Sequence, residues 1–240
     1  MRFLGIFFFL SVFLFSCESS TQSIEETPDD DKIEDIIIPP KPLKLLSLGD
    51  SYTIGESVCV DCRFPNQLKD SLIRRTDNQN ISLQIIARTG WTTTNLINAI
   101  NAENLVNEFD LVTLLIGVNN QYQGINFSVY ESEFPQLLNT AIQLARNDSK
   151  KVIVVSIPDY AFTPFGGGST SISADIDKYN NFAKTYCENR DITYVNITDI
   201  TRQGLANTGL VASDGLHPSE EAYTEFVNRI LPEALEKFGY

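Results

Sequence analysis

The stretch Leu111-Val112-Thr113-Leu114-Leu115-Ile116 is almost entirely apolar, and Val152-Ile153-Val154-Val155 repeats the pattern further along the chain. Short runs without polar alternation are typical of strands covered on both faces. Such strands belong to parallel sheets, because the crossover helices of a parallel sheet pack on either side of it. The two runs therefore predict the centre of a parallel sheet.

Strand and helix patterns alternate on both sides of these runs. Strands are predicted at residues 43–48, 81–87, 111–116, 152–157 and 193–197. Helical patterns lie near residues 64–76, 93–107, 128–148, 173–190 and 218–237, with Pro218 suited to the first position of the last helix. Because the two kinds of element alternate, we expect one α/β domain over residues 43–240. Its architecture would be a three-layer α/β/α, flavodoxin-like fold with a mainly parallel five-stranded sheet.

Short polar segments with glycine follow the first three predicted strands. Gly49-Asp50-Ser51-Tyr52 follows the first strand, Gly90-Trp91 the second, and Gly117-Val118-Asn119-Asn120 the third. A fourth segment, Asp214-Gly215-Leu216-His217-Pro218, precedes the last helix. Binding sites of open α/β sheets lie outside the carboxyl ends of the strands. We therefore expect the four segments to meet at one rim of the sheet.

The chain contains a single histidine, His217. A serine hydroxyl is a weak nucleophile unless a neighbouring base removes its proton, and only imidazole has an unperturbed pKa near neutrality. If Ser51 is a nucleophile, its base is therefore His217. Asp214 precedes His217 by three residues and can hydrogen-bond the imidazole from the same turn.

In this order and spacing, the four segments resemble the SGNH hydrolase family, or GDSL-type esterases and lipases, over residues 43–240. The resemblance implies a carboxylic ester hydrolase with Ser51, Asp214 and His217 as its catalytic triad. It also implies an oxyanion hole made by the backbone N–H groups of Ser51 and Gly90 and by the Asn119 amide. Neither a metal nor an organic cofactor is implied.

Five residues of these segments and of a later loop are weaker candidates for substrate contacts: Asp50, Tyr52, Trp91, Asn120 and Tyr160. Tyr52 stands where the family name has leucine. Asn120 stands where the third block usually has aspartate, so a supporting carboxylate is lost rather than a catalytic group. Trp91 serves either as a platform for a sugar or acyl group or as a packing residue. Tyr160 follows the fourth predicted strand and either lines the cleft or belongs to a packed loop.

The N-terminus has the pattern of an export signal. Met1-Arg2 precedes an apolar run at residues 3–15, which is too short to span a membrane as a permanent anchor. Leu14-Phe15-Ser16-Cys17 resembles the lipobox of bacterial lipoproteins, which implies cleavage before Cys17 and attachment of lipid to it. The alternative is an ordinary signal peptide with an incidental cysteine. We expect an exported, membrane-anchored lipoprotein of the periplasm or cell surface.

Charge sets limits on the partners of the chain. The net charge is −13, and residues 18–42 alone hold eight acidic residues against two lysines. Such a polar segment cannot order itself by burying apolar surface, so it predicts a disordered tether. The acidic balance argues against nucleic acid and against anionic membrane surfaces as partners. Membrane association would come from the lipid alone, and we expect a monomer.

Cys59-Val60-Asp61-Cys62 is a C-x-x-C motif. In an exported protein this spacing favours a local disulfide, with a pair of free thiols as the alternative. A zinc site would need two further ligands, and the chain has one histidine and no second cysteine pair. Cys187 has the character of a small buried hydrophobic residue.

The expected function is hydrolysis of carboxylic esters through an acyl-enzyme, on acylated glycans or small acyl esters at the cell envelope. Two alternatives remain at this point. One is a lysophospholipase or lipase acting on lipid substrates. The other is a lipoprotein that binds acylated glycans without turnover.

Overall fold

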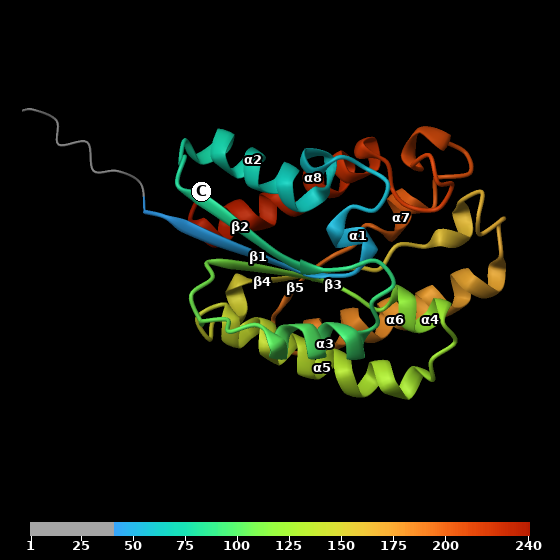
Figure 1. The fold of residues 1–240 in the computed structure, drawn as a ribbon, viewed down its shortest axis with the longest axis horizontal. Helices are drawn as coiled ribbons and strands as arrows, with labels where there is room; N and C mark the ends of the chain where they lie inside the picture. Colours follow the sequence, from blue (N-terminus) through green and yellow to red (C-terminus); the bar gives the residue numbers. More distant parts are fainter. Residues whose placement is uncertain (1–40) are drawn as a thin grey trace, which may run out of the picture. The chain divides into compact units, whose positions relative to one another are not determined.

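A computed structural model describes residues 41–240 and contains five strands (Figure 1). They are β1 (Leu43–Gly49), β2 (Ile81–Ala87), β3 (Leu111–Leu115), β4 (Val152–Val155) and β5 (Thr193–Val195). The expected signal peptide at residues 1–17, its Cys17, and the tether as far as residue 40 lie outside the described residues.

The five strands form one parallel sheet in the order β2-β1-β3-β4-β5. The predicted flavodoxin-like fold is therefore confirmed. β1 pairs with both β2 and β3, so the strand order reverses beside β1. In open α/β sheets the crevice at such a switch point, outside the carboxyl ends of the strands, is the usual binding site.

Helices cover both faces of the sheet. α2 (Phe64–Thr76) and α8 (Glu220–Phe238) lie on one face, while α3 (Thr93–Ala102), α5 (Phe127–Leu144) and α6 (Thr170–Glu188) lie on the other (Figure 1). The connections contain short helices α1 (Ser51–Ile54), α4 (Val118–Tyr122) and α7 (Thr198–Thr201), and 3-10 turns η1 (Val60–Cys62), η2 (Ser149–Lys151), η3 (Tyr160–Phe162) and η4 (Thr208–Leu210). No helix in residues 41–240 is both long and apolar enough to cross a membrane.

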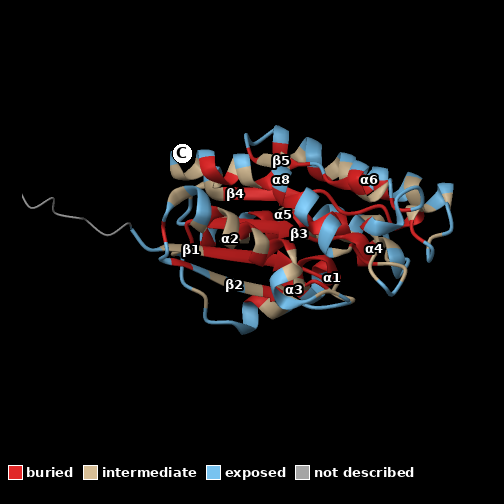
Figure 2. Cartoon of the chain, turned by 90° about the horizontal axis from the view of Figure 1, so that it is seen from above, coloured by how far each residue is buried: buried red, intermediate tan, exposed pale blue. Residues whose placement is uncertain are grey.

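The central strands are the most buried part of the molecule (Figure 2). Every residue of β3 and β4 is buried, and the side chains of Val112, Leu114 and Ile153 have no exposed surface. Continuous apolarity in the sequence thus corresponds to cover on both faces. β2 is an edge strand, and its Ser82 and Gln84 are exposed.

An aromatic cluster joins α5 to α6. Tyr130 lies 4.6 Å from Tyr179 and 5.3 Å from Phe134 between ring centroids, and Phe127 and Phe182 pack around it. Aromatic pairs at these separations contribute about 0.5–1.5 kcal/mol beyond the apolar area they bury. Because α4 leads directly toward α5, this cluster gives the α4 segment a rigid support.

Two helices end earlier than the sequence predicts. α3 and α5 end at Ala102 and Leu144, several residues before the predicted ends. After α5, Arg146 and Asn147 have φ values of 60° and 58°, a left-handed conformation that a helix cannot continue through.

The prediction for the start of the last helix is wrong. Pro218 does not occupy its first position, because α8 begins at Glu220 with Ser219 as the N-cap. The Ser219 hydroxyl accepts a hydrogen bond from the backbone N–H of Ala222 at 3.2 Å. Pro218 instead forms an antiparallel bridge with Val211, which makes the preceding segment a small hairpin.

Candidate active site

Ser51 lies at the point where β1 passes into α1. Asp50 caps the helix, since its carboxylate oxygen Oδ1 accepts a hydrogen bond from the backbone N–H of Tyr52 at 3.0 Å. The sharp change from strand to helix brings Ser51 to the carboxyl end of the sheet. Its side chain is 3% exposed, and it lines a cavity at the switch point between β1 and β3.

The hairpin before α8 holds Asp214 and His217. The backbone N–H of Ala212 donates to the carbonyl oxygen of His217 at 2.7 Å, which closes the hairpin. Asp214 Oδ2 lies 2.6 Å from His217 Nδ1, and Asp214 Oδ1 accepts the backbone N–H groups of Leu216 and His217, each at 2.9 Å. The carboxylate therefore fixes both the backbone and the imidazole of its own turn.

These contacts also keep Asp214 ionised. Partial burial on its own raises the pKa of the Asp214 carboxyl. The hydrogen bonds from His217, Ser57 and Leu216 together outweigh that effect and hold the pKa well below its usual range. An ionised Asp214 accepts the Nδ1 proton of His217, which leaves Nε2 as the basic nitrogen.

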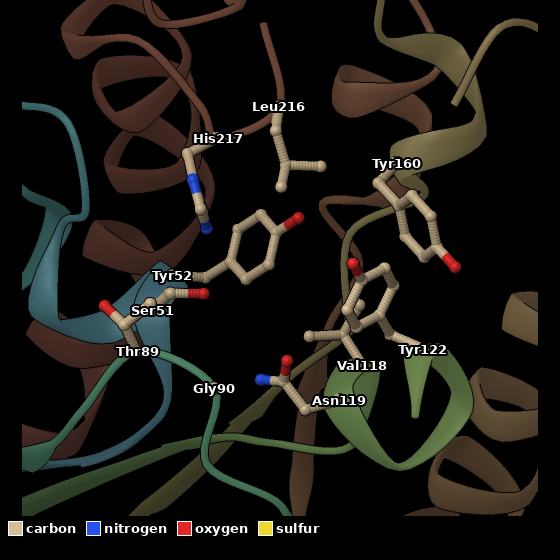
Figure 3. Close-up of a pocket in the computed structure, with 10 residues that line it drawn as sticks. All are labelled: Ser51, Tyr52, Thr89, Gly90, Val118, Asn119, Tyr122, Tyr160, Leu216 and His217. Carbon is tan, nitrogen blue, oxygen red and sulfur yellow. The ribbon is translucent and has the colours of Figure 1, made fainter. Parts of the chain in front are cut away.

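Figure 3 shows the imidazole of His217 above Ser51, with its second ring nitrogen on the side of the serine. Within the described residues the His217 ring is hydrogen-bonded to Asp214 and not to the Ser51 hydroxyl. In an unliganded site such a contact commonly closes only when substrate binds. The arrangement can therefore activate the Ser51 hydroxyl as a nucleophile.

Two groups face the serine from neighbouring segments. Gly90 has φ +83°, and a Cβ added there would meet nothing within 4 Å, so the left-handed backbone conformation, not crowding, favours glycine. Gln123 Nε2 donates to the Gly90 carbonyl oxygen at 2.9 Å. Asn119 Nδ2 donates to the Trp91 carbonyl oxygen at 3.1 Å, and its amide carries a second hydrogen. In Figure 3 that amide nitrogen faces Ser51 and Gly90.

The position of Asn119 depends on Gly117. Gly117 has φ +131°, and an added Cβ would lie 2.5 Å from Tyr130 Cε2. Glycine is thus required both for backbone conformation and for close packing on the aromatic cluster. With β3 ending just before it, this turn starts α4 so that Asn119 reaches the cavity.

The cavity has a volume of about 160 Å³. Its lining residues are Ser51, Tyr52, Thr89, Gly90, Val118, Asn119, Tyr122, Tyr160, Leu216 and His217 (Figure 3). Thr89, Val118, Tyr122 and Leu216 were missed from the sequence. Tyr122 had a usable signal, because it follows Asn119 by three residues and so shares its face of a helix.

Three of the weaker substrate-binding candidates lie outside the cavity lining. Asp50 is fully buried beneath Ser51 and caps α1. Trp91 packs against the hydrophobic core, so the packing alternative describes it. Asn120 is fully buried, which contradicts the expectation that it contacts substrate. Tyr52 and Tyr160 do line the cavity.

Asn120 has a structural task for which aspartate is poorly suited. Its Oδ1 accepts the backbone N–H of Thr93 at 2.9 Å, and its Nδ2 donates to Thr93 Oγ1 at 2.6 Å. The Thr93 hydroxyl in turn donates to Glu133 at 2.5 Å, so this hydroxyl offers Asn120 only an acceptor. A carboxylate at position 120 would face that acceptor without a proton. The departure from the family pattern thus ties α4 to α3.

Asp50 is the second unusual carboxyl of the site. Burial, only partly offset by the backbone N–H of Tyr52 and by the nearby Asn119 amide, raises the pKa of Asp50 to about 7. Its Oδ2 has no hydrogen-bond partner within the described residues. The ionised form is therefore disfavoured in the folded protein.

A pH-dependent stability follows from this burial. Between pH 4 and 7 the folded chain holds a proton on Asp50 that the unfolded chain has released, so stability falls as pH rises through this window. Asp50→Asn retains the helix cap and has no charge to bury. The free energy of unfolding of the wild type should fall by an amount on the order of 3 kcal/mol between pH 4 and 7, and we expect Asp50→Asn to lack this decrease. Thermal melts of Asp50→Asn, of the wild type and of the partly exposed Asp70→Asn across this range measure the difference. Equal pH slopes in all three would contradict it.

The cysteines occupy two environments. Cys59 and Cys62 are joined by a disulfide in the loop between α1 and α2. Cys187 is buried on α6, and burial raises the pKa of its thiol to about 12. Within residues 41–240 no cluster of histidine, cysteine, aspartate and glutamate is placed to hold a metal ion.

Solved structures with the same fold include several ester hydrolases. An acetyl xylan esterase from Geobacillus stearothermophilus is 18% identical with a TM-score of 0.63, over 82% of this chain and 96% of that one. A lipase from a goat rumen metagenome is 16% identical with a TM-score of 0.65, over 80% and 97%. A lipase/acylhydrolase from Enterococcus faecalis is 21% identical with a TM-score of 0.61, over 80% and 94%. At these identities the likeness establishes the fold alone.

Sequence comparison gives the family. No curated protein matches the chain. The model of the GDSL-like Lipase/Acylhydrolase family matches residues 47–224, which include the Ser51 turn, the Gly90 and Asn119 segments and the Asp214–His217 hairpin. The chain therefore belongs to the GDSL-like lipase/acylhydrolase family.

Proposed function

We propose that this protein is a serine esterase that removes short acyl groups from glycans or small alcohols at the cell envelope. The observation that carries the proposal is the convergence of Ser51, His217, Gly90 and Asn119 on one small cavity. Each supplies a different requirement of acyl transfer: a nucleophile, its base, and donors for the developing oxyanion.

In the proposed reaction, His217 Nε2 takes the Ser51 proton as Oγ attacks the ester carbonyl carbon. The carbonyl oxygen becomes an oxyanion, which accepts hydrogen bonds from the N–H groups of Ser51 and Gly90 and from Asn119 Nδ2. The C–O bond to the alcohol then breaks, and His217 returns the proton to the leaving oxygen. Water, deprotonated by His217, attacks the acyl-enzyme and releases the acid and Ser51.

The cavity volume supports a short acyl group. A cavity of about 160 Å³ lies below the roughly 300–1,000 Å³ of most ligand pockets, which favours a short acyl group over a fatty acyl chain.

The aromatic residues near the cavity support a substrate whose alcohol part carries a ring. Tyr122, Tyr160 and Phe165 form an aromatic group there, with ring centroids 6.0–6.3 Å apart. Tyr122 is 55% exposed and Phe165 is 54% exposed, so both are accessible to an incoming molecule. Tyrosine offers an apolar face with a hydroxyl at its edge, which suits the mixed surface of a sugar. The acetyl xylan esterase of the same fold acts, by its name, on an acetylated sugar polymer.

A lipase is the second candidate, because the same exposed aromatic residues could meet a lipid. The acidic chain weighs against anionic phospholipid surfaces. The proposal includes export and anchoring through a lipid on Cys17, with no other membrane contact and with a monomeric chain. The N-terminal sequence supports the anchor.

A substrate series tests the proposal. We expect kcat/KM to fall at least about tenfold from p-nitrophenyl acetate to the octanoate, because the longer chain cannot enter the cavity. Acetate should be released from acetylated xylan, and lysophosphatidylcholine should remain intact. Preference for the octanoate and the lysolipid would favour the lipase. Lack of turnover on every ester, with retained binding of acetylated glycan, would favour the non-catalytic alternative.

A further inference from the structure

The segment 55–62, which follows α1 and includes η1, contacts three of the four segments that form the candidate site. The backbone N–H groups of Gly55 and Glu56 both donate to the carbonyl oxygen of Ser51 at 3.0 Å. The Glu56 carboxylate accepts a hydrogen bond from the hydroxyl of Thr89, next to Gly90. The third contact, made by Ser57, reaches Asp214 across 157 residues of sequence.

Ser57 Oγ donates to Asp214 Oδ2 at 2.7 Å. The same oxygen accepts Nδ1–H of His217 at 2.6 Å. Each oxygen of Asp214 therefore has two donors, and Ser57 is the only one of the four that comes from outside the Asp214–His217 turn. A hydrogen bond to an ionised carboxylate is stronger than one between neutral groups.

The backbone of Ser57 is held in an unfavourable conformation. Its φ is +66°, in the left-handed region that is unfavourable for a non-glycine residue. Glu56 precedes it and is tied to Thr89, and the Cys59–Cys62 disulfide follows within two residues. Contacts on both sides of Ser57 thus restrain its backbone, and its hydroxyl is held by the hydrogen bond to Asp214.

We propose that Ser57 is a positioning residue of the catalytic site, held in place by the disulfide-closed loop. Its hydroxyl fixes Asp214 Oδ2 from the side opposite the hairpin, so the imidazole of His217 keeps its direction toward Ser51. Ser57 is exposed and does not line the cavity, so it acts through Asp214 and not on substrate. This role rests on the proposed esterase function.

Ser57→Gly separates the hydroxyl from the backbone. Glycine adopts φ +66° without strain, so the loop keeps its course while the donor is lost. We expect kcat on p-nitrophenyl acetate to fall about threefold to tenfold with KM nearly unchanged, which corresponds to the net loss of one ordinary hydrogen bond. Asp61→Ala, an exposed residue of the same loop outside the cavity lining, is the control and should keep wild-type kcat.

The single histidine provides a spectroscopic readout. The hydrogen-bonded Nδ1–H proton of His217 should give one downfield NMR resonance, free of overlap from other imidazoles. In Ser57→Gly the oxygen Asp214 Oδ2 accepts a hydrogen bond from His217 only, so that bond should strengthen and its resonance should move further downfield. The resonance should not move in Asp61→Ala. An unchanged resonance together with unchanged kcat would overturn the positioning role.

A double-mutant cycle tests the part played by the disulfide. Replacing Cys59 and Cys62 by alanine should lower kcat and add little to the effect of Ser57→Gly, because both changes act through the same hydroxyl. Fully additive losses of kcat would show that the disulfide does not act through Ser57, and would overturn its part in the proposal. A wild-type protein without esterase activity would instead contradict the proposed function, whereas an active wild type with a fully active Ser57→Gly variant would contradict only the inference.

Discussion

Ser51→Ala and His217→Ala are each expected to lower kcat by about 10⁴–10⁶, leaving only the rate that oxyanion stabilisation and binding provide. Ser51 is the only serine in the cavity lining, and His217 is the only histidine of the chain. Neither function can therefore pass to a neighbouring residue of the same type. The double variant should be no slower than the slower single one, because both residues serve the same proton transfer and bond formation.

Kinetics on p-nitrophenyl acetate, combined with covalent labelling by a fluorophosphonate, measure this result. The wild type should take up one label per chain, Ser51→Ala none, and His217→Ala should react far more slowly, since its serine lacks a base. Ser71→Ala on α2 controls for the loss of a serine away from the cavity. Wild-type turnover in either catalytic variant would exclude the mechanism, whatever the substrate proves to be.

The fold could be predicted because its signals are local. Continuous apolar runs identify the central strands, and alternation with helical patterns identifies the parallel crossovers, which the sheet order confirms. Helix ends are harder, because they depend on single residues such as Asn147 that turn left-handed after α5. Pro218 shows the limit most clearly, since a residue suited to a helix start instead pairs with Val211.

Some features of the candidate site can likewise be predicted from the local sequence, whereas others depend on residues distant in the chain. Motifs predict Ser51, Asp214 and His217 as candidate catalytic residues, because each lies in a short segment with its own chemistry, and the structure places Ser51 and His217 at one cavity. They do not identify Asn120 as a structural residue, because its partner Thr93 comes from another helix and the choice of amide depends on a third residue, Glu133. The role of Ser57 is invisible for the same reason: nothing near Ser57 in the sequence indicates contact with Asp214.

Asn119→Ala should lower kcat by about 10²–10³ with a small effect on KM, because its second amide hydrogen is used mainly when the oxyanion forms. Asn119 is 9% exposed and its other hydrogen is committed to the Trp91 carbonyl oxygen, so the side chain is held in place before substrate arrives. A donor fixed in advance needs no reorganisation during the reaction, which is why its loss costs more than an ordinary surface hydrogen bond.

Alanine removes the volume of the side chain together with both amide hydrogens, which is the reason for a second variant that keeps the volume and loses only the donors. Asn119→Asp keeps the shape of the side chain but places an acceptor, and above acidic pH a negative charge, where the oxyanion would form. Its kcat should therefore fall at least as far as that of Asn119→Ala, whereas loss of packing alone would make the isosteric variant the more active one. Comparing kcat and KM of both variants on p-nitrophenyl acetate, with thermal melts to show that each is folded, distinguishes the two causes. An Asn119→Asp enzyme with most of the wild-type kcat would remove Asn119 from the oxyanion hole and leave that role to the backbone N–H groups of Ser51 and Gly90.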